Sequence, residues 1–168
     1  FNAIIEESYT PIQIGEIFDS ISVCLSKGLG APIGSVLIGN SDFIKEARKV
    51  RKVFGGGMRQ AGIIAAAGIY ALDHNIPDLK RDHEHANLIK KSLQKNKTVS
   101  SIKKGNTNII IFDLKETMSP QKFIELLMQK NIRATAFGKQ SVRFVTHRDV
   151  SSLEIDYVCE VLESDVFN

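Results

Sequence analysis

Residues 22–35 contain a single lysine, Lys27, between a strand-like apolar run and a glycine-rich turn. A lysine that forms a Schiff base with an aldehyde needs a fixed position and partial desolvation, so that its amine is uncharged. The turn also offers groups that can approach a phosphate closely, namely Ser26, Gly28, Gly30 and Gly34. From the residues alone, Lys27 is either a Schiff-base lysine or an ordinary solvated lysine.

Three further segments contain cations that could meet an anion. Five lysines and arginines crowd residues 45–52, which either meet a phosphate or form a solvated helix face. A triglycine at residues 55–57 precedes Arg59 and lets the backbone come close to a ligand. Arg143 lies in an apolar run, where it is either solvent-facing or a bidentate anchor for a carboxylate.

Residues 22–35, 51–60 and 142–147 together resemble, in the same order, the low-specificity L-threonine aldolase family of pyridoxal phosphate enzymes. The resemblance runs over essentially the whole chain and is most specific at residues 25–30 and 55–60. It implies an α/β fold with two parts. Residues 1–77 would be the carboxy-terminal part of the large, cofactor-binding domain of a fold-type I enzyme, and residues 78–168 a small carboxy-terminal α/β domain.

The resemblance also implies an activity and a site. The enzyme would be a lyase that uses pyridoxal 5'-phosphate to cleave L-threonine, L-allo-threonine and related β-hydroxy-α-amino acids to glycine and an aldehyde. Lys27 would be the catalytic lysine that binds the cofactor. Ser26, Lys52 and Arg59 would bind the cofactor near its phosphate, and Arg143 would hold the substrate carboxylate.

Two alternative functions stay open on these residues. In the first, the protein is another fold-type I enzyme, such as a β-eliminating lyase. In the second, it is a non-catalytic α/β interaction module in which Lys27 is a surface residue. His147 is either the base for the β-hydroxyl or a structural histidine.

The resemblance implies partners as well. We expect a homodimer or homotetramer with the active site at the subunit interface. The family has an Asp-Gly-Ala-Arg stretch and a ring-stacking residue in an upstream half. The chain is therefore expected to be the carboxy-terminal half of a subunit.

Composition bears on three other kinds of function, namely nucleic-acid binding, membrane insertion and metal binding. The chain has 168 residues, 43% of them hydrophobic, and a formal charge of +3, which does not indicate nucleic-acid binding. No apolar run reaches the length of a membrane span. Cys24 and Cys159 have no metal-ligand spacing, so we expect no metal site and two buried thiols in a reducing cytoplasm.

Hydrophobic periodicity predicts the elements of the first half. Residues 1–15 show no capping signal, and strands are expected at residues 20–26 and 35–39. Ser41 is expected to cap a helix. Residues 58–73 are apolar nearly all round, which predicts a helix buried in the core or in a subunit interface.

The second half has a different pattern. A more polar helix is predicted over residues 79–95, with His83 and His85 on its surface. A strand is expected at residues 108–113, followed by a helix that Ser119 and Pro120 begin. Strands at residues 132–136 and 142–145, joined at Gly138, and a last helix with a Ser151–Glu154 capping box complete the pattern. This order predicts a small antiparallel or mixed sheet covered by helices on one face.

Overall fold

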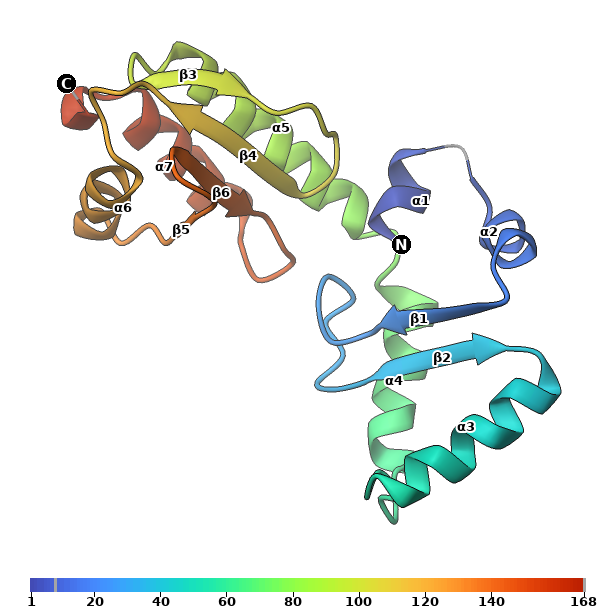
Figure 1. The fold of residues 1–168 in the computed structure, drawn as a ribbon. Coiled ribbons are helices and arrows are strands. Elements are labelled where there is room, and N and C mark those ends of the chain that lie inside the picture. Colours follow the sequence, from blue (N-terminus) through green and yellow to red (C-terminus); the bar gives the residue numbers. More distant parts are fainter. Residues whose placement is uncertain (8, 168) are drawn as a thin grey trace. The chain divides into compact units, whose positions relative to one another are not determined.

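The computed structural model describes residues 1–7 and 9–167, which form two compact units (Figure 1). The first unit comprises Phe1 and Ala3–Pro77, and the second comprises Asn2 and the chain from Asp78 onward. The elements of the first unit and the helix α1 are α1 (Asn2–Glu6), α2 (Pro11–Ile17), β1 (Ser20–Cys24), β2 (Ser35–Gly39), α3 (Ser41–Val53) and α4 (Gly62–His74). Those of the second are α5 (Leu79–Lys95), β3 (Val99–Ile102), β4 (Ile109–Leu114), α6 (Pro120–Gln129), β5 (Thr135–Ala136), β6 (Ser141–Val145), α7 (Ser152–Glu163) and the 3₁₀ turn η1 (Asp165–Phe167).

The strands of the first unit form an antiparallel hairpin, in which Ser20 lies opposite Gly39 and Cys24 opposite Ser35. Both strands were predicted, and β1 ends two residues earlier than expected. The prediction of a buried thiol at Cys24 is wrong, because this side chain is exposed. Cys24 shares a face of β1 with Ser20 and Ser22, and all three residues are exposed.

Two helices of the first unit begin differently from the prediction. Thr10 forms a capping box with Gln13 at the start of α2, so the expectation of no capping signal in residues 1–15 is wrong. For α3 the cap is Asn40 rather than Ser41, since the Asn40 Oδ1 accepts a hydrogen bond of 2.9 Å from the Phe43 amide. A side chain one residue earlier than predicted therefore satisfies one of the free amides of the first turn.

Helix α4 is apolar nearly all round, as the sequence indicates, yet it is not buried in the described chain. Only Gly68 and Ala71 of this helix are buried, whereas Ile63 is 82% exposed and Tyr70 62% exposed. Burial in the core of this chain is therefore wrong as a prediction, whereas burial in a subunit interface stays a prediction. An all-round apolar helix needs neighbours on every side, and the described residues of the first unit cover one side. Over residues 1–7 and 9–167, no helix combines the length and apolar character that a membrane crossing requires.

The second unit contains a four-stranded antiparallel sheet with the strand order β3-β4-β6-β5. The predicted sheet is thus antiparallel, and the strand at residues 108–113 is β4, shifted by one residue. Strand β3 was not predicted, because it is only four residues long and two of them are serines. Alternate residues of β4 point to opposite faces, so Ile110, Phe112 and Leu114 are buried while Ile109 is exposed.

Helices α5, α6 and α7 contribute to one core with the buried face of this sheet, as expected (Figure 1). The Phe112 ring lies at the centre of this core, 5.6 Å from the ring centroids of both Phe123 and Phe144. The capping residues Ser119 and Ser151 are confirmed at the starts of α6 and α7. Each hydroxyl accepts a backbone amide hydrogen bond, which fixes where the helix begins.

The Phe112→Ala variant tests the importance of this core. We expect it to lower the free energy of unfolding by about 3–5 kcal/mol, because it removes a fully buried ring and leaves a cavity. Urea denaturation followed by circular dichroism measures the change. Leu153→Ala is the matched control, since Leu153 is 81% exposed; a loss as large in the control would contradict this assignment of the core.

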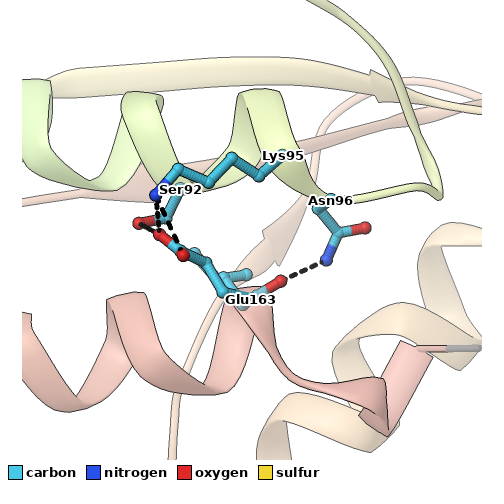
Figure 2. A network of polar contacts seen from close by, with 5 residues as sticks. Ser92, Lys95, Asn96 and Glu163 are labelled. Carbon is cyan, nitrogen blue, oxygen red and sulfur yellow. Dashed lines mark hydrogen bonds and ion pairs between the residues drawn. The ribbon is translucent and has the colours of Figure 1, made fainter.

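The ends of α5 and α7 are joined by polar contacts, which Figure 2 shows from close by. The Glu163 carboxylate accepts hydrogen bonds of 2.8 Å from Ser92 and 2.9 Å from Lys95. These donors, Lys95 first, lower the pKa of Glu163. The Asn96 side chain donates to the Leu162 carbonyl at 2.7 Å. The contacts hold the two helices in register beside the core.

The start of α5 departs from the prediction of surface histidines. His83 and His85 are both buried, and each is 4% exposed. The His85 Nε2 lies 3.1 Å from the Ser152 hydroxyl, and the His83 Nε2 lies 2.8 Å from the Asn2 side chain. The expectation fails because the polar partners that satisfy these rings come from sequence-distant segments.

Candidate functional site

Lys27 lies in the connection between β1 and β2, where short backbone hydrogen bonds fold the chain back on itself. The Leu25 amide donates to the Gly34 carbonyl at 3.0 Å, and the Gly30 amide donates to the Lys27 carbonyl at 2.8 Å. Gly30 has a φ of 70° and Gly34 a φ of 114°, values that favour glycine. The glycine pattern thus encodes a tight turn, and Lys27 and Ser26 are exposed on it.

This turn is fixed to helix α4 by buried side chains on either side of the lysine. Leu25 is 7% exposed and Leu29 3% exposed. The Asn75 side chain, at the end of α4, donates a buried hydrogen bond of 2.7 Å to the Leu29 carbonyl. A Cβ atom on Gly68 of α4 would lie 3.0 Å from the Leu25 Cδ1, so the small residue allows this close packing. The structure therefore presents the Lys27 amine from a rigid support.

Lys52 folds over the triglycine that ends α3. A Cβ atom on Gly57 would lie 2.8 Å from the Lys52 Cδ and 3.0 Å from its Nζ. Gly55 has a φ of 80°, and the Gly56 amide donates to the Arg51 carbonyl at 2.8 Å. A side chain at Gly57 would displace the lysine, so this position holds the ammonium beside bare backbone. Arg59 follows two residues later and is exposed.

Arg143 belongs to the second unit, at the middle of β6, and is half-buried. It lies opposite Ile111 of β4 and Thr135 of β5, on the sheet face that points away from the core. Within the described chain its Nε is buried without a hydrogen-bond partner. The Phe137 ring centroid is 5.7 Å from its Cζ. The guanidinium therefore lies within cation–π range of an aromatic ring, and its Nε donor has no hydrogen-bond partner among the described residues.

Another residue on this outward face is Asp113, whose carboxylate is already bound by a lysine and two serines. It lies 2.5 Å from the Lys103 ammonium and accepts hydrogen bonds from Ser141 at 2.6 Å and Ser101 at 2.9 Å. The hydrogen bond from Lys103, followed by that from Ser141, lowers the pKa of Asp113 to about 2. The sequence analysis missed Asp113. The signal for it was a charged residue between two apolar residues of β4, which places its side chain on the outward face.

Asp113→Asn tests these contacts through pH. The folded pKa of about 2 lies below the ordinary 3.8, so the carboxylate stabilises the folded state fully above about pH 4 and loses this effect as pH falls toward 2. We expect the variant to be less stable by about 1–2 kcal/mol at pH 7, with a difference that shrinks below pH 4. Urea titrations from pH 7 to pH 3 measure it against the exposed control Asp156→Asn. A pH-independent difference would contradict the assignment.

His147 follows β6, and its Nδ1 is 3.6 Å from the Asp149 carboxylate. It also lines a mostly apolar cavity of about 420 Å³ in the second unit, together with Arg133 and Tyr157. The residues predicted to bind cofactor or substrate do not line this cavity; these are Ser26, Lys27, Lys52, Arg59 and Arg143. Within residues 1–7 and 9–167, no three His, Cys, Asp or Glu side chains gather so as to hold a metal ion.

Asp82, which the sequence analysis did not single out, is a buried carboxylate near these residues. It is 0% exposed, and in the described part of the chain neither carboxylate oxygen has a hydrogen-bond partner. Burial raises its pKa, and Arg81 and His85 oppose that effect. Its carbonyl accepts a hydrogen bond of 2.6 Å from the Thr146 hydroxyl, which ties α5 to the end of β6.

The structure therefore groups the predicted residues by unit. Lys27 and Ser26 share one turn, and Lys52 and Arg59 flank one triglycine, all within the first unit. Arg143 lies in the second unit. The roles assigned to these residues stay predictions.

Solved structures resemble the fold over nearly the whole chain. A Listeria monocytogenes EGD-E protein provisionally named an L-allo-threonine aldolase matches with a TM-score of 0.73 and 19% identity, covering 93% of this chain and 47% of that one. The histidinol-phosphate aminotransferase of Clostridium acetobutylicum matches with a TM-score of 0.68 and 14% identity, over 97% of this chain and 51% of that one. These likenesses confirm the predicted α/β fold of part of a fold-type I enzyme.

Curated relatives are more similar in sequence. The low specificity L-threonine aldolase of Escherichia coli (strain K12) is 40% identical over 151 residues, which are 90% of this chain and 44% of the relative. Low-specificity L-threonine aldolase 1 of Arabidopsis thaliana is 36% identical over 160 residues, 94% of this chain and 45% of the relative. The chain spans about half the length of the curated relatives that it matches.

A family comparison covers the larger part of the chain. The sequence model of the family described as Beta-eliminating lyase matches residues 1–117. This range includes the turn around Lys27 and the triglycine with its two flanking cations. The chain belongs to the beta-eliminating lyase family.

Proposed function

We propose that the protein containing this chain is a pyridoxal phosphate-dependent lyase that cleaves L-threonine, L-allo-threonine and related β-hydroxy-α-amino acids to glycine and an aldehyde. The observation that carries the proposal is the glycine-rich turn that exposes Lys27 between two buried leucines, Leu25 and Leu29. The similarity to low-specificity L-threonine aldolases, at 36% and 40% identity, supports the choice of substrate.

The residues present fit this cofactor by their chemistry. Lys27 supplies an exposed primary amine on a rigid turn, which an aldehyde requires. Because Gly57 has no Cβ, the Lys52 ammonium lies against its backbone. A cation beside open backbone is suited to binding a phosphate. The Arg143 Nε is buried and has no hydrogen-bond partner among the described residues, so it offers a donor for a substrate carboxylate.

When bound, pyridoxal phosphate supplies an electron sink that stabilises negative charge at the substrate Cα. The residues of this chain have separate tasks in the proposal. Lys27 would hold the cofactor through its amine. Ser26, Lys52 and Arg59 would bind the cofactor phosphate.

Arg143 has the positioning task for the substrate. Its two-pronged guanidinium binds the α-carboxylate in one orientation. With the carboxylate fixed, the Cα–Cβ bond is held in the direction in which it breaks. Loss of the β-hydroxyl proton then releases the aldehyde, and His147 is one candidate for the base.

Assembly and location are part of the proposal. We infer a homodimer or homotetramer with the active site at the subunit interface, which the exposed apolar surface of α4 supports. We infer a cytoplasmic protein, which the free thiols of Cys24 and Cys159 support.

A second candidate is a β-eliminating lyase of the same fold, favoured by the family match. The two activities give different products from L-threonine. Retro-aldol cleavage yields glycine and acetaldehyde, whereas elimination of the hydroxyl yields 2-oxobutanoate and ammonia. Product analysis of the full-length protein with L-threonine and L-allo-threonine tests the proposal. Glycine and acetaldehyde in equal amounts are expected; ammonia and 2-oxobutanoate, or a colourless protein without turnover, would contradict it.

A further inference from the structure

Phe137 lies beside Arg143 on the outward face of the second unit's sheet, and local geometry fixes it there. It follows β5 directly, and its amide donates a hydrogen bond of 2.8 Å to the Ser141 carbonyl of β6. Gly138, with a φ of 82°, turns the chain between the two strands. The hairpin thus places the ring centroid 5.7 Å from the Arg143 Cζ, within the range of a cation–π interaction.

The surroundings of Arg143 make the Phe137 ring important. The Arg143 Nε is buried without a hydrogen-bond partner in the described chain. The Asp113 carboxylate on the same face is bound by Lys103, Ser101 and Ser141. A carboxylate neighbour would occupy the N–H donors of the guanidinium, whereas an aromatic ring attracts the cation through its π face and leaves those donors available.

We propose that Phe137 is a positioning residue that orients the Arg143 guanidinium for an incoming carboxylate. The inference rests on the proposed function, in which that carboxylate belongs to the amino acid substrate. Phe137 does not touch the reacting atoms in this account. Replacing Phe137 is therefore expected to weaken carboxylate affinity and to raise KM, with little change in kcat.

The test compares three variants in the full-length protein: Phe137→Leu, Phe137→Tyr and the matched control Phe18→Leu. Phe137 is 46% exposed and Phe18 55% exposed, so neither substitution empties a core. We expect the dissociation constant of glycine, used as the carboxylate probe, to rise about two- to fivefold in Phe137→Leu. The KM for L-threonine rises by the same factor, while Phe137→Tyr and Phe18→Leu stay near the parent protein.

A second readout does not depend on activity. In protein labelled with ¹⁵N-arginine, the Arg143 Nε–Hε resonance is identified by its absence in Arg143→Lys. Removal of the ring in Phe137→Leu should shift this resonance, because a guanidinium over an aromatic ring experiences the ring current. In the Arg143→Lys background, Phe137→Leu should change glycine affinity by a smaller factor.

Unchanged glycine affinity and an unmoved resonance in folded Phe137→Leu would overturn the inference, as would an equal effect in the Arg143→Lys background. A lower melting temperature with an unchanged glycine dissociation constant would show a structural role and would also overturn it. If L-threonine is not cleaved but glycine affinity and the resonance respond, the proposed function fails and the positioning role stands.

Discussion

Replacement of Lys27 by alanine is expected to abolish turnover of L-threonine, with a loss in kcat on the order of 10⁵ or more. In the proposed function the amine of Lys27 holds the cofactor aldehyde. The turn that carries Lys27 is fixed by buried contacts, and the variant loses this intramolecular presentation. Added methylamine should restore only a small fraction of the rate, because a free amine lacks that fixed position. Steady-state formation of acetaldehyde measures the effect.

The matched control for this experiment is Lys80→Ala, since Lys80 is an exposed lysine at the start of α5. We expect its rate and its visible absorption spectrum to equal those of the parent protein. The Lys27→Ala variant should keep its fold by circular dichroism, because its side chain is exposed. Near-normal turnover in folded Lys27→Ala would exclude Lys27 from catalysis.

The second large effect is expected for Arg143→Lys, which should lower kcat/KM for L-threonine by about 2–4 kcal/mol, the range for breaking a charge-assisted contact in a desolvated site. Lysine keeps the charge but lacks the planar pair of donors that matches a carboxylate. Cofactor affinity should change little, because Arg143 is assigned to the substrate. Kinetics with L-threonine and a cofactor titration measure the two quantities.

Arg133→Lys is the control for this substitution, since Arg133 is an exposed arginine of the same unit. It should leave kcat/KM within about twofold of the parent value. Unchanged kinetics in Arg143→Lys with full cofactor occupancy would remove Arg143 from the site. A parallel loss of cofactor would instead place its effect on cofactor binding.

Local signals predicted the elements whose ends are fixed by their own residues. Helix α5 has the predicted bounds, and Ser151 with Glu154 forms the predicted capping box. These features depend on side chains within one turn of the helix terminus. The same holds for the turn around Lys27, where Gly30 and Gly34 adopt conformations that favour glycine.

Burial was less predictable, because it depends on which other segments cover a residue. His83 and His85 are buried by partners far away in sequence, Asn2 and Ser152. Cys24 lies in an apolar run, but it shares a face of β1 with Ser20 and Ser22 and is exposed. A period of two identifies a strand and does not show what lies over it.

The candidate site shows the same division. Lys27 could be selected from the glycine-rich turn that follows it, and Lys52, Arg59 and Arg143 from the resemblance to the family. Phe137 and Asp113 could not be selected, since their relation to Arg143 depends on the register between β4, β5 and β6. One residue of slip would move each of them to the opposite face of the sheet.

The central claim is that Lys27 binds pyridoxal phosphate covalently. Borohydride reduction of the full-length holoenzyme, followed by proteolysis and mass spectrometry, tests it most directly, because reduction converts the labile bond to the lysine into a stable one. We expect one phosphopyridoxyl group per subunit, on the peptide that contains Lys27. A label on Lys52 or on any other lysine, with Lys27 unmodified, would contradict the account.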